Sequence, residues 1–180
     1  MERTNVGFEK LRAYMADMLE RGLGFPRDTA EISARVLVEA DARGHASHGV
    51  ARIKMYFEEV SEGQDDPKAT PEIVHETPVS LVVRGNRAPG FASSKLAMDR
   101  TIEKAKAHGT CMTVVRDSCH FGMAGYWAEM AADAGLIGVA MTNTLRAGIP
   151  LFGKERLLGT NPICVAIPTG EKPHFMLDMA

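Results

Sequence analysis

The order of the hydrophobic patterns constrains the fold of this 180-residue chain more than any other feature. In residues 1–62, apolar side chains recur at the three- and four-residue spacing of an amphipathic α-helix. The periodic sets are Phe8, Leu11, Met15, Met18 and Leu19; then Ile32, Val36, Leu37 and Ala40; then Val50, Ile53, Phe57 and Val60. A glycine that favours helix termination follows each set, at Gly22, Gly44 and Gly63. The first part of the chain therefore predicts a layer of three helices.

Two helix beginnings follow from the same pattern. We expect the second helix to begin at Asp28, because Glu31 stands three residues later, as in a capping box. We expect the third helix to run from about Ser47 to Glu62, with its apolar stripe directed toward a core.

The pattern changes after the polar, turn-rich run at residues 61–70. Strand-like runs follow near residues 72–76, 79–84, 111–116, 136–143, 163–167 and 174–178, and helix-like runs near 92–107 and 123–134. Alternating strands and helices predict an α/β layer. We therefore expect a mixed α/β fold in which a helical region at residues 1–65 precedes an α/β domain at residues 66–180.

Composition excludes several classes of protein. The net charge of -2 and the pI of about 6.3 argue against a basic surface for nucleic acid. No apolar signal segment opens the chain, and its most apolar run, Gly135–Met141, is too short to span a bilayer. The three cysteines, Cys111, Cys119 and Cys164, are odd in number and are interpreted as reduced thiols. We expect a cytoplasmic protein with no membrane or nucleic-acid partner.

The end of the sequence is unusual because Phe175–Ala180 reads as an apolar strand. Chain ends are usually loose unless they dock into the fold. This pattern suggests a chain cut within a longer α/β domain.

Three polar side chains in the third helical segment form a candidate site. His48, Arg52 and Tyr56 are four residues apart, so on a helix they advance by only ~40° per step and share one face. Arg52 offers a planar fork for a carboxylate, His48 exchanges a proton near neutral pH, and Tyr56 donates a hydrogen bond. This arrangement suits an organic acid, while the alternative interpretation is a solvated helix face.

A second candidate is His120, which lies between the strand near residues 111–116 and the next helix. Ligands of α/β layers gather beyond the carboxyl ends of strands. A histidine there can exchange the proton that accompanies hydride transfer to a ketone. The nearby Gly122 and Gly125 allow backbone to approach a ligand. The alternative is a histidine that caps the helix or packs without a chemical role.

Several well-known site patterns are absent from the sequence. No G-x-G-x-x-G follows a strand, and there is no G-x-x-x-x-G-K-[ST] loop or G-x-S-x-G elbow. His45 and His48 are three residues apart, but no further ligands stand at zinc-like spacing, so no metal site is expected. These residues alone predict an α/β enzyme with a histidine and arginine site.

Four stretches, in order, resemble the malate/L-lactate dehydrogenase family, which also includes ureidoglycolate and sulfolactate dehydrogenases and cyclic-imine reductases. They are ADARGHASHGVAR at 40–52, HFGMAGY at 120–126, GVAMTN at 138–143 and LGTNPI at 158–163. The terminal LDMA at 177–180 is similar to the start of the family's next motif. The resemblance covers nearly the whole chain, and four ordered motifs make it specific.

The resemblance implies a non-Rossmann cofactor-binding fold, truncated here, with the 1–65 region carrying the substrate-site helix. It implies a homodimer that transfers hydride between NAD or NADP and a small 2-oxo/2-hydroxy acid such as malate or lactate. The residue roles that it implies are an acid/base at His120, supported by Ser47 and His48; substrate binding by Arg52, Tyr56 and Thr160; and cofactor contacts by Thr144, Asp178, Met179 and Ala180.

Two departures from the family pattern matter. Many relatives continue after residue 144 with Ser-Pro, where this chain has Leu145-Arg146, and relatives are much longer. Arg146 could read a second carboxylate or a phosphate, or be an ordinary exposed loop arginine. The alternatives are therefore a cyclic-imine carboxylate reductase of the same fold, or an inactive fragment or dimerisation module.

Overall fold

The computed structural model describes residues 5–170 and 172–179, which divide into two compact units, 1–123 and 124–180. The first unit contains α1 (Phe8–Asp17), a π-helical turn (Met18–Gly22), α2 (Arg27–Ala42), two 3-10 turns (Ala46–His48 and Val50–Arg52), α3 (Ile53–Ser61), β1 (Glu72–Thr77), β2 (Ser80–Arg84), α4 (Gly90–His108) and β3 (Met112–Arg116). The second contains α5 (Ala124–Asp133), β4 (Gly138–Met141), β5 (Ile163–Ile167) and β6 (Phe175–Met179). The expected mixed α/β fold is confirmed. The domain boundary at residue 65 lies inside the first unit and stays a prediction.

The first two helices pack against each other and bury the periodic side chains expected from the sequence, among them Leu19, Val36 and Leu37. The start of α2 differs from the expectation. It begins at Arg27 after Pro26, whose side chain makes no capping hydrogen bond, so no capping box forms at Asp28. Glu31 instead accepts a hydrogen bond of 2.7 Å from Arg27 Nε, because an opposite charge stands one turn earlier on the helix.

The third helix is shorter than expected because α3 begins only at Ile53. Residues 46–52 form two 3-10 turns separated at Gly49. The carboxylate of Asp41 causes this break: its Oδ2 accepts the backbone N–H of Val50 at 2.9 Å. Its Oδ1 lies 1.9 Å from the place where a side chain at Gly49 would begin. A half-buried carboxylate that occupies this space requires glycine and interrupts the helix.

The buried face of α3 also differs from the expectation. Tyr56 is only 1% exposed, whereas Phe57, which was expected in the core, is 37% exposed. The 3-10 turns advance about 3.0 residues per turn instead of 3.6, so the residues before Ile53 do not continue the helical periodicity. The i, i+4, i+8 argument for one common helix face was therefore wrong. His48 and Arg52 precede the helix that carries Tyr56.

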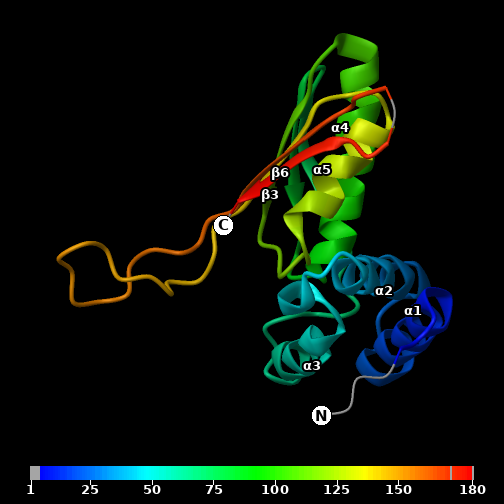
Figure 1. Cartoon of the computed structure of the whole chain (residues 1–180), viewed down its shortest axis with the longest axis vertical. Coiled ribbons are helices and arrows are strands. Elements are labelled where there is room, and N and C mark those ends of the chain that lie inside the picture. The colour runs from blue at the N-terminus through cyan, green and yellow to red at the C-terminus, as the bar shows by residue number, and fades with distance from the viewer. Residues whose placement is uncertain (1–4, 171, 180) are drawn as a thin grey trace. The chain divides into compact units, whose positions relative to one another are not determined.

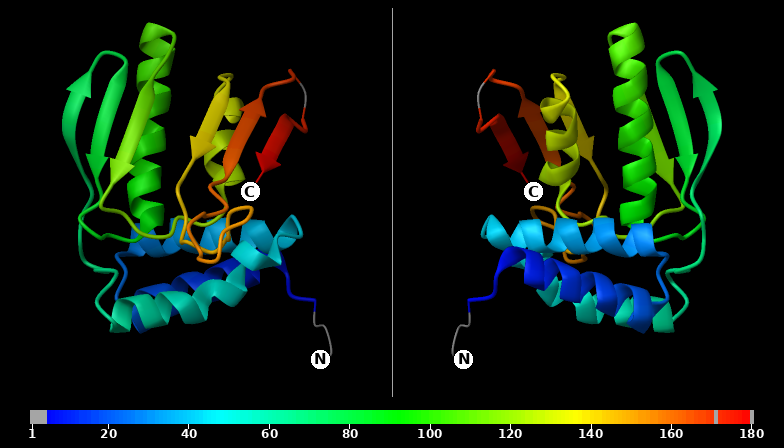
Figure 2. Two further views of the ribbon diagram at one scale, coloured as in Figure 1. Left: turned by 90° about the vertical axis from the view of Figure 1, so that its left-hand side faces the viewer. Right: turned by 90° about the vertical axis from the view of Figure 1, so that its right-hand side faces the viewer.

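A three-stranded sheet follows in the first unit, in the order β1-β2-β3. Strands β1 and β2 are antiparallel, β2 and β3 are parallel, and α4 connects the parallel pair (Figure 2). Helix α4 packs against β2 and β3, and Leu81 and Val83 of β2 are fully buried. Since the crossover ends in β3, it brings the segment after β3 to the carboxyl edge of the sheet.

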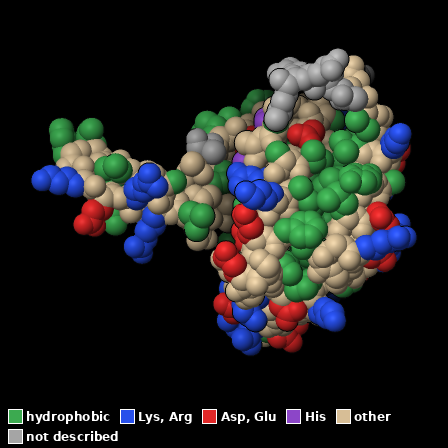
Figure 3. Space-filling model, turned by 90° about the horizontal axis from the view of Figure 1, so that it is seen from below, with side chains coloured by type: hydrophobic (Ala, Val, Ile, Leu, Met, Phe, Trp, Pro, Cys, Tyr) green, Lys and Arg blue, Asp and Glu red, His purple; other side chains and the backbone are tan. Residues whose placement is uncertain are grey.

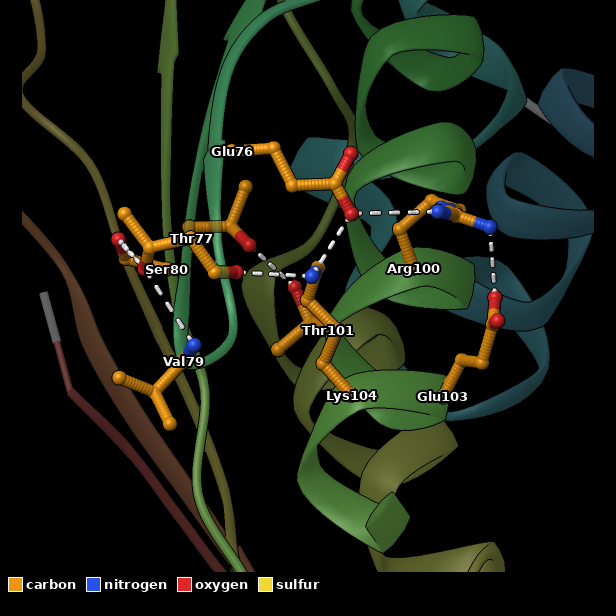
Figure 4. A network of polar contacts seen from close by, with 9 residues as sticks. Glu76, Thr77, Val79, Ser80, Arg100, Thr101, Glu103 and Lys104 are labelled. Atoms are coloured by element: carbon orange, nitrogen blue, oxygen red, sulfur yellow. Dashed lines mark hydrogen bonds and ion pairs between the residues drawn. The ribbon is translucent and has the colours of Figure 1, made fainter. Parts of the chain in front are cut away.

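A polar network joins β1 to α4 (Figure 4). Lys104 Nζ lies 2.7 Å from Glu76 Oε1 and donates to the carbonyl oxygen of Thr77 at 2.8 Å. The hydrogen bond from Lys104 lowers the pKa of the Glu76 carboxyl, and Arg100 adds a weaker contact. The network holds the β1–β2 hairpin against α4. It lies at one end of the strands, and His120 lies beyond the opposite end, where β3 finishes.

The second unit is an antiparallel meander, β4-β5-β6, packed against α5. Trp127 of α5 is 1% exposed, and Cys164 and Ala166 of β5 are fully buried. A side chain at Gly138 would begin 2.1 Å from the carbonyl oxygen of Ala128, so glycine permits β4 to approach α5 closely. Gly138, Cys164 and Ala166 are small, so the four-residue strand β4 and its neighbour β5 can pack closely against the short helix α5.

A long loop connects β4 to β5 and protrudes from the ends of these strands (Figure 1). It contains one isolated antiparallel bridge, between Gly148 and Leu158, and exposes Leu151 and Phe152 almost completely. On the face drawn in Figure 3, acidic and basic side chains are interspersed, as the small net charge suggests. Among the described residues, no helix is both long and apolar enough to cross a lipid bilayer.

Candidate active site

His120 lies in the segment that follows β3, as expected from the sequence. Two glycines shape this segment. A side chain at Gly90, the first residue of α4, would begin 2.2 Å from the carbonyl oxygen of Cys119 and 2.4 Å from that of His120. Gly122 has a φ of +80°, which side-chain-bearing residues rarely adopt. The backbone around His120 is therefore held against the beginning of α4.

The His120 ring is bonded to Tyr56 of α3. The Tyr56 hydroxyl lies 2.7 Å from His120 Nδ1, and the backbone N–H of Gly122 donates to the same nitrogen at 3.3 Å. Because a backbone N–H can only donate, Nδ1 accepts in the neutral ring, and the ring proton is carried by Nε2. The Tyr56 hydroxyl then donates to Nδ1 and orients the imidazole.

Burial keeps Tyr56 protonated. The side chain packs edge-to-face against Phe91, with ring centroids 5.6 Å apart. Desolvation raises the pKa of the Tyr56 hydroxyl well above its ordinary value, and the neighbouring Glu59 adds to the increase while Arg52 opposes it. Tyr56 is therefore a fixed hydroxyl group at neutral pH, suited to positioning His120.

His48 and Ser47 lie beside His120, although neither residue is on α3. The rings of His48 and His120 are stacked, with centroids 5.8 Å apart and an interplanar angle of 23°. Ser47 Oγ lies 2.9 Å from His48 Nδ1. The structure thus brings together the pair expected to support proton transfer and the expected acid/base, through a 3-10 turn rather than a helix face.

The Arg52 side chain is held by contacts with residues close to it in sequence. Its Nε donates to the carbonyl oxygen of Ser47 at 2.6 Å, and Nη1 contacts Met55 Sδ at 3.3 Å. No carboxylate pairs with Arg52 among the ion pairs of the described residues. With Nε bonded to backbone and Nη1 to a thioether, the guanidinium still has N–H groups on its terminal nitrogens that can bind an anion.

The electrostatics of the site favour the neutral His120 ring. Burial lowers the pKa of His120 from its ordinary value to about 4, and the positive charges of Arg52 and His48 contribute. A carboxylate bound at Arg52 would offset the positive charge by which Arg52 lowers the pKa of His120. We therefore expect an anion at Arg52 to raise the pKa of His120 toward the range in which it can donate a proton.

Replacing Arg52 with methionine will raise the pKa of His120 above about 4, because it removes a nearby positive charge and leaves the burial in place. The rise will stop short of the ordinary value, since desolvation is the larger cause. A ring-carbon NMR titration of His120 measures the change. Lys54→Met, on the exposed side of α3, is the matched control, and an unchanged His120 titration in Arg52→Met would contradict the electrostatic contact.

Three residues near this site were not identified as site residues from the sequence. The charges of Glu59 and Asp65 raise the pKa of the Tyr56 hydroxyl, and the Cys119 thiol beside Asp65 donates to the carbonyl oxygen of Arg87 at 3.5 Å. Glu59 follows Tyr56 by three residues, so its helical spacing could have revealed it. Asp65 stood in a polar run that was interpreted as a boundary, and Cys119 as an ordinary reduced thiol.

The second unit brings together two other expected residues, Thr144 and Thr160. Thr144 Oγ1 accepts the backbone N–H of Thr160 at 2.8 Å, and the backbone N–H of Thr144 donates to Asn161 Oδ1 at 3.0 Å. A side chain at Gly159 would begin 2.2 Å from Thr144 Oγ1. These contacts close the base of the long loop and give both threonines a structural function.

Asp178 and Met179 lie on β6, opposite Cys164 and Ile163 of β5. Both are exposed, and Asp178 Oδ2 lies 2.9 Å from the position of a side-chain carbon at Gly125, near the start of α5. An exposed carboxylate and hydroxyl groups of this kind suit the ribose and carboxamide groups of a nicotinamide cofactor. Ala180, the fourth expected cofactor contact, lies outside the described residues.

Within residues 5–170 and 172–179, no group of three or more histidine, cysteine, aspartate or glutamate side chains is arranged to hold a metal ion. The polar side chains gathered around His120 in the first unit include instead those of Arg52, His48, Ser47 and Tyr56. Such a set can bind a carboxylate and exchange one proton beside it.

The chain is similar to several known oxidoreductases. The chain is 40% identical over 172 residues to L-sulfolactate dehydrogenase of Methanocaldococcus jannaschii, covering 96% of this chain and 49% of that protein. The structure of malate dehydrogenase from Pyrococcus horikoshii matches with a TM-score of 0.93 at 39% identity, over 98% of this chain and 50% of that one. Delta1-piperideine-2-carboxylate reductase of Pseudomonas syringae matches with a TM-score of 0.91 at 25% identity, over 99% and 53%.

The chain therefore spans about half the length of the relatives that it matches. The family model for malate/L-lactate dehydrogenase matches residues 6–180, almost the whole chain. The four ordered motifs and the matching fold extend over the same residues. On these grounds, the chain belongs to the malate/L-lactate dehydrogenase family.

Proposed function

We propose that this chain carries the substrate site of an NAD(P)-dependent dehydrogenase that interconverts a small 2-oxo acid and the corresponding 2-hydroxy acid. The observation that carries the proposal is the cluster in which Tyr56 bonds His120 while the positive charge of Arg52 lies near enough to lower the pKa of His120, and Arg52 forms no ion pair within the described part of the chain. A 2-oxo acid has a carboxylate next to a carbonyl, so it needs one anion-binding group and one proton donor side by side.

The residues divide the work as follows. The Arg52 guanidinium binds the substrate carboxylate, preferably through two parallel hydrogen bonds. A bound reduced nicotinamide supplies a hydride to C2 of the oxo acid. With the substrate carboxylate bound at Arg52, His120 carries a proton on both ring nitrogens and gives the one on Nε2 to the oxygen as negative charge develops there, which leaves a neutral ring protonated at Nδ1. Because the Tyr56 hydroxyl can accept as well as donate, it accepts a hydrogen bond from Nδ1–H in this complex and donates to Nδ1 in the free chain.

For the cofactor, we propose contacts with Thr144, Asp178, Met179 and Ala180, and Thr160 beside the substrate. Both NADH and NADPH are included, because the described residues identify no group that reads the 2′-phosphate. The resemblance further supports a homodimer working in the cytoplasm, which gel filtration and localisation of the tagged protein would test.

The proposed function is tested by incubating the purified chain with NADH or NADPH and either pyruvate or oxaloacetate, while cofactor fluorescence and absorbance are recorded. Oxidation of the cofactor that depends on the oxo acid is the expected result. Binding without oxidation would assign the chain a binding site that requires further elements. A folded chain that binds neither cofactor nor oxo acid would contradict the proposal.

Replacing Arg52 with lysine will raise the apparent KM for the oxo acid more than it changes kcat. Lysine keeps the charge but presents a single ammonium group, which cannot form the two parallel hydrogen bonds of a guanidinium. Steady-state kinetics with pyruvate measure the effect, and Lys54→Arg is the matched control at an exposed position. Unchanged KM in Arg52→Lys would remove Arg52 from the substrate site.

A cyclic-imine carboxylate is the second candidate substrate, and the likeness to delta1-piperideine-2-carboxylate reductase favours testing it. It presents the same carboxylate next to a C=N bond in place of C=O, so Arg52 and His120 would keep their roles. Parallel assays with pyruvate and with delta1-piperideine-2-carboxylate distinguish the candidates by their kcat/KM values.

A further inference from the structure

Two carboxyl groups lie near Tyr56 without belonging to the proposed proton-transfer chain. Glu59 follows Tyr56 on α3, and Asp65 lies in the segment after this helix, where it is only 5% exposed. The backbone N–H groups of Gln64 and Asp65 both donate to the carbonyl oxygen of Glu59, at 2.8 and 3.2 Å. These bonds fold the segment back onto the end of α3 and hold both carboxyl-bearing residues there.

The two carboxyl groups are poorly solvated. Glu59 Oε2 is shielded from solvent and has no hydrogen-bond partner among the described residues. The thiol of Cys119, the residue directly before His120, donates to the carbonyl oxygen of Arg87 at 3.5 Å and lies near enough to Asp65 to lower the pKa of that carboxyl, which burial raises more strongly. Two shielded carboxyl groups with so few donors cannot both carry a negative charge at low cost.

The surrounding charges divide into two groups. Arg52 favours an ionised Glu59, while Asp65 and Glu62 oppose it. Desolvation is larger than any of these and raises the pKa of Glu59 to about 7; it also raises the pKa of Asp65. The Cys119 thiol faces Asp65, Glu59 and Arg87, and burial raises its pKa, so the thiol stays a neutral donor.

We propose that Glu59 and Asp65 hold one proton between them near neutral pH, and that this proton keeps Arg52 available to the carboxylate of the substrate. Ionisation of both groups would place a second negative charge near Arg52, where it would compete electrostatically with an incoming anion. Glu59 is thus a positioning residue that acts through Arg52. The part that concerns the substrate rests on the proposed function, whereas the retained proton does not.

A retained proton makes stability depend on pH in a definite direction. The folded chain holds the Glu59 proton up to about pH 7, whereas an unfolded chain releases it near about pH 4.3. Between these values the folded state binds more protons, so stability falls as pH rises. Glu59→Gln cannot ionise, so its stability will fall less over this interval.

The first experiment is a carboxyl-carbon NMR titration of the chain labelled at aspartate and glutamate. A Glu59 signal that titrates near neutrality, and that is absent in Glu59→Gln, is expected. Asp65→Asn will shift the Glu59 titration to lower pH, because it removes a like charge. Glu58→Gln, on the exposed side of the same helix, is the matched control and leaves the Glu59 titration unchanged. A Glu59 carboxyl that titrates in the ordinary range would overturn the proposal.

The second experiment measures binding of pyruvate from chemical-shift changes below and above neutrality. The dissociation constant of the unaltered chain is expected to rise about three- to tenfold across this range, equivalent to roughly half to one pKa unit of coupling. It will stay nearly constant in Glu59→Gln. The same rise in both proteins would overturn the link to Arg52.

The two proposals fail in different ways. A neutral-pH titration of Glu59 without any binding of pyruvate would contradict the proposed function and the link to Arg52, and support the retained proton. Pyruvate binding with a Glu59 that titrates in the ordinary range would support the function and contradict the retained proton. If Glu59→Gln does not fold, the titration shift in Asp65→Asn decides the question.

Discussion

Replacing His120 with asparagine is expected to lower kcat for the oxo acid by about 10²–10⁴-fold, the usual contribution of a positioned acid/base group. Asparagine places its side-chain oxygen near the position of His120 Nδ1, so it can still accept hydrogen bonds from Tyr56 and Gly122. It has no group that exchanges a proton in the neutral pH range. The variant should therefore fold and bind the substrate anion at Arg52 while it fails in proton transfer.

Measurements of kcat, KM and thermal unfolding separate these effects. His108→Asn, at the exposed end of α4, is the matched control and should leave kcat unchanged. If His120→Asn keeps the kcat of the unaltered protein, His120 is not the acid/base, and its bond to Tyr56 is purely structural. A simultaneous loss of stability would instead show that the hydrogen bonds were not preserved.

Replacing Gly90 with alanine is expected to lower the free energy of unfolding by at least about 1–3 kcal/mol, the usual cost of overpacking. Helix propensity alone predicts the opposite, since alanine is favoured over glycine in helices by about 1 kcal/mol. Steric contact decides the sign here. The new side chain would meet the backbone carbonyl groups of Cys119 and His120, which cannot rotate away as a flexible side chain can.

Denaturant unfolding measures this effect, and the His120 ring signals in NMR show whether the site moves with it. Gly7→Ala is the matched control, because a side chain there meets nothing within 4 Å and would leave stability nearly unchanged. The expected pattern is lower stability together with a displaced His120 ring in Gly90→Ala. A stable variant with an unshifted ring would show that the segment carrying His120 adapts without cost.

The secondary structure followed closely from local sequence patterns. The periodic side chains Leu19, Val36 and Leu37 are buried as expected, and the strand at 163–167 has the expected bounds. These features depend on which side chains are buried away from water, and the periodic spacing of apolar residues in the sequence indicates those side chains directly. Position relative to a strand also placed His120 correctly at the end of β3.

The third helix shows where local patterns were insufficient. His48, Arg52 and Tyr56 were expected on one helix face, but Asp41 interrupts the helix at Gly49 and leaves only Tyr56 on α3. Asp41 precedes Gly49 by eight positions and acts from another helix. No periodicity records a carboxylate that approaches from a neighbouring element, so the break required the tertiary structure.

The sequence by itself determined the order of the elements, the family motifs and the residue types available for anion binding and proton exchange. The tertiary structure decided which of these groups meet. It joined Tyr56 to His120 across 64 positions of the sequence. It also shielded Glu59 and Asp65 from water, and thereby altered their proton affinity. The physical reason is that hydrophobic periodicity is a local property, whereas desolvation and hydrogen bonding depend on neighbours that only the folded chain supplies.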